Sequence, residues 1–434
     1  MQKKQKGLIW FRNDLRVHDN ESVTNAVRDN ENVIAVYCFE PRQYQQTKYG
    51  FKKTEKFRAK FLIESVLVLK KNLKKLNITL FVFYENGENV IPEIVNNNGI
   101  TSIYLQQEWT SEEKEVLESI KLKVPVLTKF NATYNQFLFH PEDIPFEIQS
   151  IPNVFTQFRN KCEKSTNIRP EFTVQPMPQE NLGADENEFP TLEKLGFSNF
   201  EMDSRTAFPY FGGEDDALKR LQIYFWETKK LSVYKLTRNG LIGSDFSSKF
   251  SPWLANGSIS AKTIYWEIIK YEKQIEKNES TYWLIFELIW RDYFKYISLK
   301  NGNSIFKIGG ILDKDYDWKT NKSAVNKWIT GNTLEPFVNA NMIEIKETGW
   351  MSNRGRQNVA SHFAKDLLLD WRIGAAYFEA MLIDYDVHSN YGNWMYVSGV
   401  GNDPRNRKFN IPLQASNYDG QSKFQNLWLQ QKLF

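Results

Sequence analysis

Residues 7–39 read GLIWFRNDLRVHDNESVTNAVRDNENVIAVYCF and contain two runs of apolar and β-branched residues, at 7–11 and 32–39. Similar runs follow at 78–84 (ITLFVFY) and 101–106 (TSIYLQ). Short, continuous apolar runs are typical of strands that are buried on both faces of a parallel sheet. We therefore predict an α/β unit in this part of the chain.

Amphipathic stretches separate these strands. Residues 55–76 carry apolar side chains at helical spacing, and residues 91–95 and 112–120 indicate further helices. Strands that alternate with helices predict a doubly wound parallel sheet. We place this α/β N-terminal domain at residues 1–135.

The sequence changes character after the predicted sheet. Residues 136–205 are rich in proline, asparagine and acidic residues, as in RPEFTVQPMPQENLGADENEFP at 169–190, and predict a long interdomain linker. From 206 to 434 helical patterns dominate, and the clearest lie at 213–230, 260–277, 281–299 and 357–369. We expect an all-α C-terminal domain there.

The composition excludes several classes of protein. The 434 residues include two cysteines and four scattered histidines, so we expect neither a disulfide framework nor a metal site. No apolar run reaches the roughly 18–20 residues of a membrane span, and the first residues lack the uncharged core of a signal peptide. We predict a cytoplasmic protein without a membrane partner. A net charge of +4 permits a polyanionic partner without requiring one.

The aromatic content is high, with 13 Trp, 20 Tyr and 31 Phe. One interpretation is a large aromatic core. The other is that several aromatic side chains form a site for flat, conjugated molecules.

Motifs of common nucleotide and hydrolase sites are absent. The first strand runs into WFRNDLRVHDN (10–20) and not into a G-x-G-x-x-G turn or a Walker loop, and no Gly-x-Ser-x-Gly elbow occurs. The predicted sheet is therefore not an ordinary dinucleotide site.

The segment SDFSSKFSPWL (244–254) places Ser247, Ser248, Lys249 and Ser251 ahead of a helical pattern. Hydroxyl groups, a cation and free backbone N–H groups at such a position can hold a phosphate. An ordinary serine-rich helix cap explains the same residues.

Two later segments contain several charged residues close together in sequence. TGWMSNRGRQN (348–358) places Asn353, Arg354 and Arg356 ahead of a predicted helix, where they form either an anion site or a solvated basic turn. In LIDYDVHSNYGNW (382–394), Asp384 and Asp386 can chelate a hard cation, or can join Arg356 in clamping the polar edge of a heteroaromatic ring.

Together these segments resemble the photolyase and cryptochrome superfamily, and its DASH branch in particular. The resemblance extends over the whole chain, and RNGLIG, SNRGRQN and the NYGNW ending followed by NDPR are its most specific parts. The segments that carry it are WFRNDLRVHDN (10–20), YKLTRNGLIGSDFSSKFSPWLANGSIS (234–260), WLIFELIWRDYF (283–294), TGWMSNRGRQNVASHFAKDLLLDWRIG (348–374) and YGNWMYVSGVGNDPRNRKFN (391–410).

The resemblance implies an α/β domain that can hold an antenna chromophore, a long linker and a helical domain that binds FAD in a folded form. By matching motif, Asn390 would face the redox-active nitrogen of the flavin, where an uncharged amide avoids repelling the reduced ring. The other residues implied to bind FAD are Tyr234, Ser247, Ser248, Ser251, Arg291, Asn353, Arg356, Asp384 and Asp386.

Three tryptophans match the electron relay of the family. In the order from flavin to surface they are Trp394, Trp371 and Trp318. Each also has the simpler interpretation of core packing.

The resemblance further implies a pocket for a pyrimidine dimer flipped out of DNA. Its implied catalytic residues are Glu287, Trp290, Asn353 and Tyr396, and Arg354 and Gln357 are implied to contact DNA. Tyr396 stands where photolyases that act on duplex DNA have tryptophan, and Gln357 where they have methionine. Weaker stacking compensates less for extracting a base from a duplex, so we expect repair mainly in single-stranded DNA.

Two departures accompany the resemblance. The segment GNTLEPFVNANMI (331–343) lacks the Asp and Arg that the family has at Asn339 and Ile343; because these lie at i and i+4, both members of a helical ion pair are lost together. Near QQEWTSEE (106–113), Glu108 is the best candidate to contact a methenyltetrahydrofolate antenna, although its neighbours match loosely.

We therefore predict a light-driven, FAD-dependent lyase that repairs cyclobutane pyrimidine dimers, acting as a monomer. The main alternative is a blue-light photoreceptor or DNA-binding regulator, which we expect less because no extended tail follows FNIPLQASNYDG (409–420). A light-independent electron-transfer flavoprotein is the third possibility, and the implied lesion residues disfavour it.

Overall fold

The computed structural model describes residues 5–184, 188–403 and 405–430. Its single sheet has five parallel strands in the order β3-β2-β1-β4-β5. The strands are β1 (Lys6–Phe11), β2 (Asn32–Cys38), β3 (Leu80–Phe83), β4 (Ser102–Gln106) and β5 (Lys129–Thr133). The first four were predicted from their apolar runs and are confirmed.

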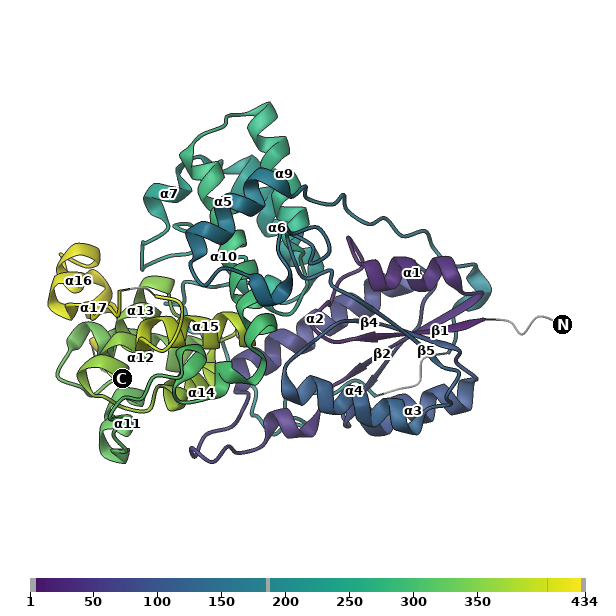
Figure 1. The fold of residues 1–434 in the computed structure, drawn as a ribbon, viewed down its shortest axis with the longest axis horizontal. Helices are drawn as coiled ribbons and strands as arrows, with labels where there is room; N and C mark the ends of the chain where they lie inside the picture. The colour runs from purple at the N-terminus through teal and green to yellow at the C-terminus, as the bar shows by residue number, and fades with distance from the viewer. Residues whose placement is uncertain (1–4, 185–187, 404, 431–434) are drawn as a thin grey trace.

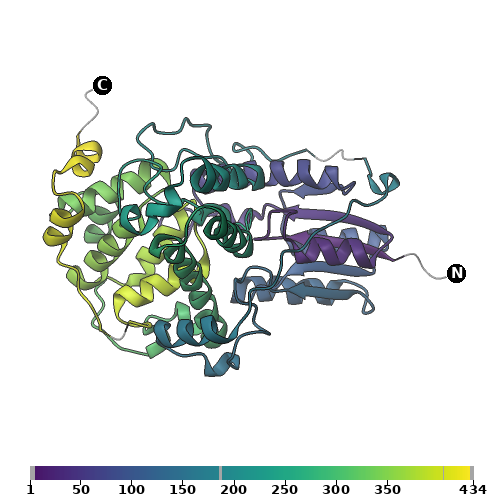
Figure 2. The ribbon, with the colours of Figure 1, turned by 90° about the horizontal axis from the view of Figure 1, so that it is seen from above.

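Helices cover both faces of the sheet, as a doubly wound fold requires (Figures 1 and 2). Apolar side chains of α1 and α2 pack in one cluster with one face, and those of α3 and α4 pack in another cluster with the other face. The bounds are α1 (Glu21–Asp29), α2 (Lys56–Lys75), α3 (Gly87–Asn98) and α4 (Ser111–Lys123). The predicted α/β fold class of this domain is thus confirmed.

The predicted linker has more structure than its composition suggested. It contains α5 (Phe155–Ser165), whose buried Phe155, Phe158 and Cys162 belong to a core cluster of the helical domain. Farther on, Asn181 bonds the backbone of Val33 in the sheet, accepting at 2.8 Å and donating at 2.9 Å. The segment after β5 therefore joins the helical core first and then returns along the sheet domain.

The rest of the described chain forms the helical domain, as predicted, and lies on the left in Figure 1. Its α-helices are α6 (Glu214–Leu221), α7 (Tyr234–Thr237), α8 (Ser251–Ala255), α9 (Ala261–Gln274), α10 (Glu279–Asn301), α11 (Lys322–Ile329), α12 (Pro336–Thr348), α13 (Asn353–Ser361), α14 (Trp371–Met381), α15 (Val387–Ser398), α16 (Ile411–Tyr418) and α17 (Lys423–Leu429). Two π-helical turns, Gln222–Glu227 and His362–Asp366, follow α6 and α13 directly.

Two helices, α10 and α15, position several of the polar side chains discussed below. The long helix α10 begins with a capping box, in which Asn278 and Thr281 each accept a backbone N–H of the other. The helix α15 begins at a cap formed by Asp386, whose carboxylate accepts the N–H of Ser389 at 2.8 Å. Because α10 and α15 pack against each other, side chains from distant parts of the sequence meet between them.

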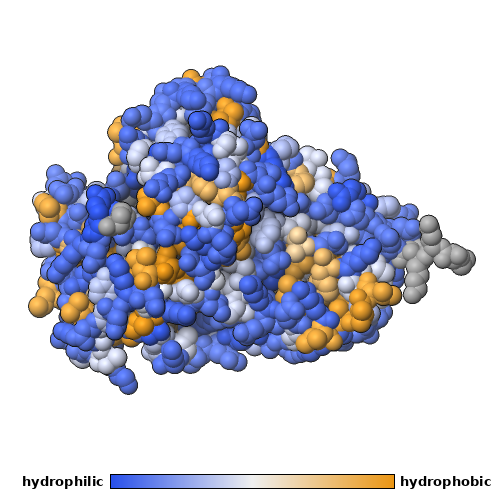
Figure 3. Space-filling view, viewed as in Figure 1, coloured by the Kyte–Doolittle hydropathy of each residue, from blue (hydrophilic) through white to orange (hydrophobic). Residues whose placement is uncertain are grey.

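The face shown in Figure 3 is largely hydrophilic, and its apolar residues gather in separate patches. Over the described residues, the structure has no helix that is both long enough and apolar enough to cross a membrane.

Candidate functional site

The helical domain contains a cavity of about 570 Å³, within the roughly 300–1,000 Å³ range of small-molecule sites. A smaller cavity of about 70 Å³ adjoins it and shares wall residues such as Arg356 and Asp384; we call the two together the central cavity. It is lined by all the residues implied to bind FAD: Tyr234, Ser247, Ser248, Ser251, Arg291, Asn353, Arg356, Asp384, Asp386 and Asn390. The residues implied to hold the lesion or DNA line it as well: Glu287, Trp290, Asn353, Arg354, Gln357 and Tyr396.

The serine-rich segment forms one wall of this cavity. Arg220 of α6 fixes its backbone by donating to the carbonyl oxygens of Ser244, Ser247 and Ser248 at 3.1–3.2 Å. Lys249 also lines the cavity, and burial lowers the pKa of this lysine, although Glu344 opposes the shift. A tethered loop with three serines and a buried lysine fits the phosphate interpretation of this segment.

Of the two acids expected to join Arg356, Asp384 forms an ion pair with it. Nη2 of Arg356 lies 2.9 Å from both carboxylate oxygens of Asp384, and Nε donates to the carbonyl of Met351 at 2.9 Å. Asp386 is bound separately, by Lys295 and by the N–H of Ser389, both at 2.8 Å. The two acids are therefore occupied by different partners, and this arrangement favours the ring clamp over the chelate.

One detail of the prediction needs correction. Asn353, Arg354 and Arg356 do not precede a helix but form the first turn of α13, because Ser352 caps it by accepting the N–H of Gly355 at 3.0 Å. Arg291 lines the cavity, and its guanidinium donates to the carbonyls of Gln136 and Leu254 at 2.6 and 3.0 Å; its role at a flavin stays a prediction.

The predicted relay tryptophans come from three segments of one packed cluster. Trp394 is buried beside the smaller cavity, and a Cβ at Gly374 would lie 2.2 Å from its ring, so glycine there lets the indole touch α14. Trp371 begins that helix and donates to the carbonyl of Ile308 at 2.9 Å. Trp318 is half-buried, edge-on to Tyr316 at 5.5 Å. Electron transfer through them stays a prediction.

The residues implied to hold the lesion have partners of their own in the wall of the same cavity. Glu287 forms an ion pair with Arg238, and burial raises the pKa of Glu287 while Arg238 opposes that rise. Trp290 meets Tyr396 edge-on, with ring centroids 6.1 Å apart, and stacks on Phe155 at 3.6 Å. These aromatic rings provide flat surfaces suited to a base.

Three further polar contacts involve residues that line this cavity. Arg407 donates to the hydroxyl of Tyr396 at 2.8 Å. Arg354 donates to Gln357 at 3.0 Å and to Asn239 at 3.3 Å. A cluster of cations here fits a ligand that carries phosphate groups.

Sequence reasoning missed several of these residues. Arg238 lies one helical turn after Tyr234, a spacing that could have placed both on one face. Phe155 gave no signal because it lies in a stretch that we predicted as linker. Arg220 and Arg407 bind backbone or hydroxyl groups that no motif identifies.

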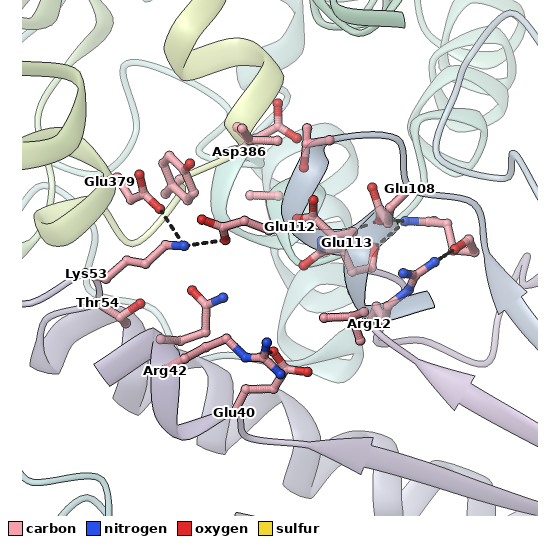
Figure 4. Close-up of a pocket in the computed structure, with 18 of the residues that line it drawn as sticks. Arg12, Glu40, Arg42, Lys53, Thr54, Glu108, Glu112, Glu113, Glu379 and Asp386 are labelled. Carbon is pink, nitrogen blue, oxygen red and sulfur yellow. Dashed lines mark hydrogen bonds and ion pairs between the residues drawn. The ribbon is translucent and has the colours of Figure 1, made fainter. Parts of the chain in front are cut away.

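A second cavity, of about 810 Å³, lies between the two domains (Figure 4). It opens where β1 and β4 end, between neighbouring strands whose connections run in opposite directions, and this switch point is where open α/β sheets bind ligands. Glu108 lines it, held by Gln106 at 2.9 Å and Asn13 at 3.5 Å. Burial and the neighbouring Glu108 raise the pKa of Glu113 to about 7.

Charged and aromatic side chains surround this interdomain cavity. Lys53 reaches Glu112 and Glu379 across it, as Figure 4 shows. The aromatic residues in its wall are Trp10, Phe11, Tyr37, Phe39, Tyr44, Phe306, Tyr385 and Tyr391. Among the residues described by the structure, no three His, Cys, Asp or Glu side chains gather as metal ligands.

Known proteins match both parts of the chain. A family model for DNA photolyase matches residues 7–180, and one for the FAD binding domain of DNA photolyase matches residues 283–432. Cryptochrome DASH of Danio rerio is 48% identical over 432 residues, which cover 97% of this chain and 82% of the relative. The similarity therefore extends over nearly the whole length of the chain.

Solved structures agree. A cryptochrome of Synechocystis sp. PCC6803 superposes with a TM-score of 0.94 at 44% identity, covering 99% of this chain and 89% of its own. A photolyase of the archaeon Sulfolobus tokodaii, described with two FAD molecules, gives a TM-score of 0.78 at 25% identity over 98% of this chain and 90% of its own. The chain belongs to the photolyase and cryptochrome family, and its helical part is the FAD-binding domain of that family, with the DASH cryptochromes as its relatives.

Proposed function

We propose that the protein is a blue-light-driven, FAD-dependent lyase that splits cyclobutane pyrimidine dimers, preferentially in single-stranded DNA. The observation that carries this proposal is the composition of the central cavity. One cavity brings the flavin-clamp residues Arg356 and Asp384 together with Glu287, Trp290 and Tyr396. A flipped base could therefore approach a bound flavin without a separate channel.

FAD, when bound, reduced and excited by blue light, supplies an electron that opens the cyclobutane ring and then returns, so that no net redox change occurs. The residues of the chain would orient the flavin and stabilise the charge of its reduced ring. Arg356 holds Asp384 by two hydrogen bonds, and its positive charge offsets the extra negative charge of a reduced ring. Asn390 presents an uncharged amide, whose Nδ2 donates to the carbonyl of Ala375 at 3.0 Å.

Glu287 would donate a hydrogen bond to the radical anion of the dimer, or would protonate it and take the proton back when the electron returns. Its partial burial favours the protonated form, and Arg238 favours the ionised form. A carboxyl group balanced between these influences can change its protonation state when a ligand displaces Arg238.

The strand preference follows from stacking. Tyr396 offers a smaller ring than tryptophan, and Gln357 is tied to Arg354 by a hydrogen bond. Flipping a dimer from a duplex costs a few kcal/mol of stacking and pairing, which a single strand does not require. The weaker pocket therefore compensates less well for extraction from a duplex.

We also propose that the interdomain cavity holds methenyltetrahydrofolate as an antenna. The pterin ring presents N–H and amino donors, for which the carboxylate of Glu108 is a suitable acceptor. The aromatic walls suit a flat chromophore, and Arg12, Arg42 and Lys53 offer positive charge for the carboxylates of the glutamate tail. A monomer in the cytoplasm is part of the same proposal.

The deciding experiment uses reduced protein and oligonucleotides that contain one thymine dimer, single- or double-stranded. Under blue light we expect intact thymine to reappear, faster from the single strand, and not in the dark. Glu287→Ala should lower the rate while FAD remains bound. If the flavin photoreduces but neither substrate is repaired, the photoreceptor alternative replaces this proposal.

A further inference from the structure

The wall between the central cavity and the interdomain cavity contains a buried ion pair. Nζ of Lys295, on α10, donates to Oδ2 of Asp386 at 2.8 Å, and the two side chains are 5% and 12% exposed. Lys295 lines the interdomain cavity, whereas Asp386 lines both cavities. Figure 4 shows Asp386 at the edge of the interdomain cavity, at the start of the helix drawn in yellow.

Lys295 is the cation that neutralises Asp386. Burial alone would raise the pKa of Asp386, but the charges of Lys295, His388 and Arg291 lower it well below its usual range. Burial lowers the pKa of His388, and Nδ1 of this ring lies 2.8 Å from the hydroxyl oxygen of Ser298. Arg291 donates its hydrogen bonds to the backbone carbonyls of Gln136 and Leu254. Lys295 therefore gives Asp386 its charged hydrogen bond.

Asp386 also determines where α15 begins. Its other oxygen, Oδ1, caps the helix by accepting the N–H of Ser389. The same helix carries Asn390, Trp394 and Tyr396 into the central cavity. A change in the position or charge of Asp386 would thus reach the flavin edge directly.

We propose that Lys295 is a positioning residue for the flavin, acting from the side of the interdomain cavity: it holds Asp386 in place and cancels its charge, and so sets how readily the bound FAD is reduced. This inference rests on the proposed binding of FAD in the central cavity. Removing one member of a buried pair leaves an uncompensated charge, whereas removing both is often tolerated. A carboxylate without its cation would repel the added electrons of a reduced flavin.

The test compares the midpoint potential and the retention of bound FAD in purified wild type and variants at pH 8. Lys295→Met should move the potential to a lower value and weaken FAD retention about tenfold or more. Lys295→Arg should restore both, because it keeps the charge. Lys300→Met is the matched control: Lys300 lies on the same helix and bonds Ile151 and Asn153, away from both cavities, so the potential should not move.

A double variant covers the case in which Lys295→Met loses FAD altogether. If Lys295 acts through Asp386, then Lys295→Met combined with Asp386→Asn should regain FAD, since neither charge is left alone. An unchanged potential in Lys295→Met, or a double variant that binds no better than the single one, overturns the inference. If wild-type protein itself cannot bind FAD, the proposed function fails instead.

Discussion

Nη2 of Arg356 lies 2.9 Å from both carboxylate oxygens of Asp384, and the Asp384 side chain is only 2% exposed. The arginine belongs to α13 and the aspartate to the turn before α15. The pair therefore joins two segments of the cavity wall that are 28 residues apart in sequence.

Arg356→Ala should lower FAD retention by about tenfold or more, which is ~1.4 kcal/mol or more, because it leaves the buried carboxylate of Asp384 without its cation. The flavin-to-protein absorbance ratio after gel filtration measures this. Arg28→Ala, which breaks an exposed pair with Asp29 on the far domain, is the control and should retain FAD fully. Full occupancy in Arg356→Ala would contradict the assignment of the pair to the flavin.

Trp371→Phe should slow photoreduction of FAD without releasing it, because phenylalanine is much harder to oxidise than an indole. Transient absorption of the flavin after a blue flash gives the rate. Trp328→Phe is a matched control, since Trp328 is buried in the same cluster and also donates its indole N–H to a backbone carbonyl. Equal rates in both variants would remove Trp371 from the relay.

Tyr396→Trp combined with Gln357→Met should bring repair of duplex DNA closer to repair of single strands. Stacking of a base on an aromatic side chain contributes roughly 1–3 kcal/mol, and a larger ring increases it. The measurement is the ratio of repair rates on matched single- and double-stranded oligonucleotides. Tyr396→Phe, which loses only the hydroxyl that Arg407 contacts, is the control for the lost hydrogen bond. If the ratio in the double variant equals that of the wild type, weaker stacking is not the cause of the preference for single-stranded DNA.

How far the sequence predicts this fold depends on how apolar each element is. The buried strands β1–β4 were predictable from their apolar runs. The strand β5 was missed because Lys129 and Asn131 interrupt its apolar pattern at the edge of the sheet. In α5, Phe155, Phe158 and Cys162 lie at i, i+3 and i+7, a helical stripe that the surrounding prolines and acids obscured.

The candidate site was likewise predictable only in part. Residue types in long motifs placed Arg356, Asp384 and Glu287 around one cavity. The contacts of Arg291 and Lys295, by contrast, were not predictable from motifs. Arg291 binds backbone carbonyls, and Lys295 meets Asp386 only because α10 and α15 pack together. Such contacts depend on tertiary packing, which a local pattern does not encode.

Glu108→Gln should reduce retention of methenyltetrahydrofolate while FAD stays bound, because the amide lacks the negative charge that attracts the ring donors. The near-ultraviolet band of the folate, compared with the flavin band, measures the two chromophores separately. Glu115→Gln is the control, since Glu115 lines the same cavity but is exposed. Folate bound equally well by Glu108→Gln would show that another residue holds the ring.

Asp292→Asn should change how stability depends on pH. Burial raises the pKa of Asp292 to about 7, although Arg291 and the N–H groups of Leu138 and Phe139 oppose the rise. An unfolded aspartate ionises near pH 4, so between about pH 4 and 7 the folded chain holds a proton that the unfolded chain releases. The contribution of this group to stability is therefore full below about pH 4 and is lost as the pH rises to 7.

Asparagine does not titrate, and it keeps an oxygen that can accept the N–H groups of Leu138 and Phe139 at the start of the predicted linker. We expect the melting temperature of Asp292→Asn, relative to wild type, to increase steadily between pH 5 and pH 7.5. Differential scanning fluorimetry across that range measures the difference, with the exposed Asp313→Asn as control. If the melting temperatures of wild type and Asp292→Asn change in parallel with pH, then Asp292 is ionised throughout, stabilised by the hydrogen bonds that it accepts from two backbone N–H groups.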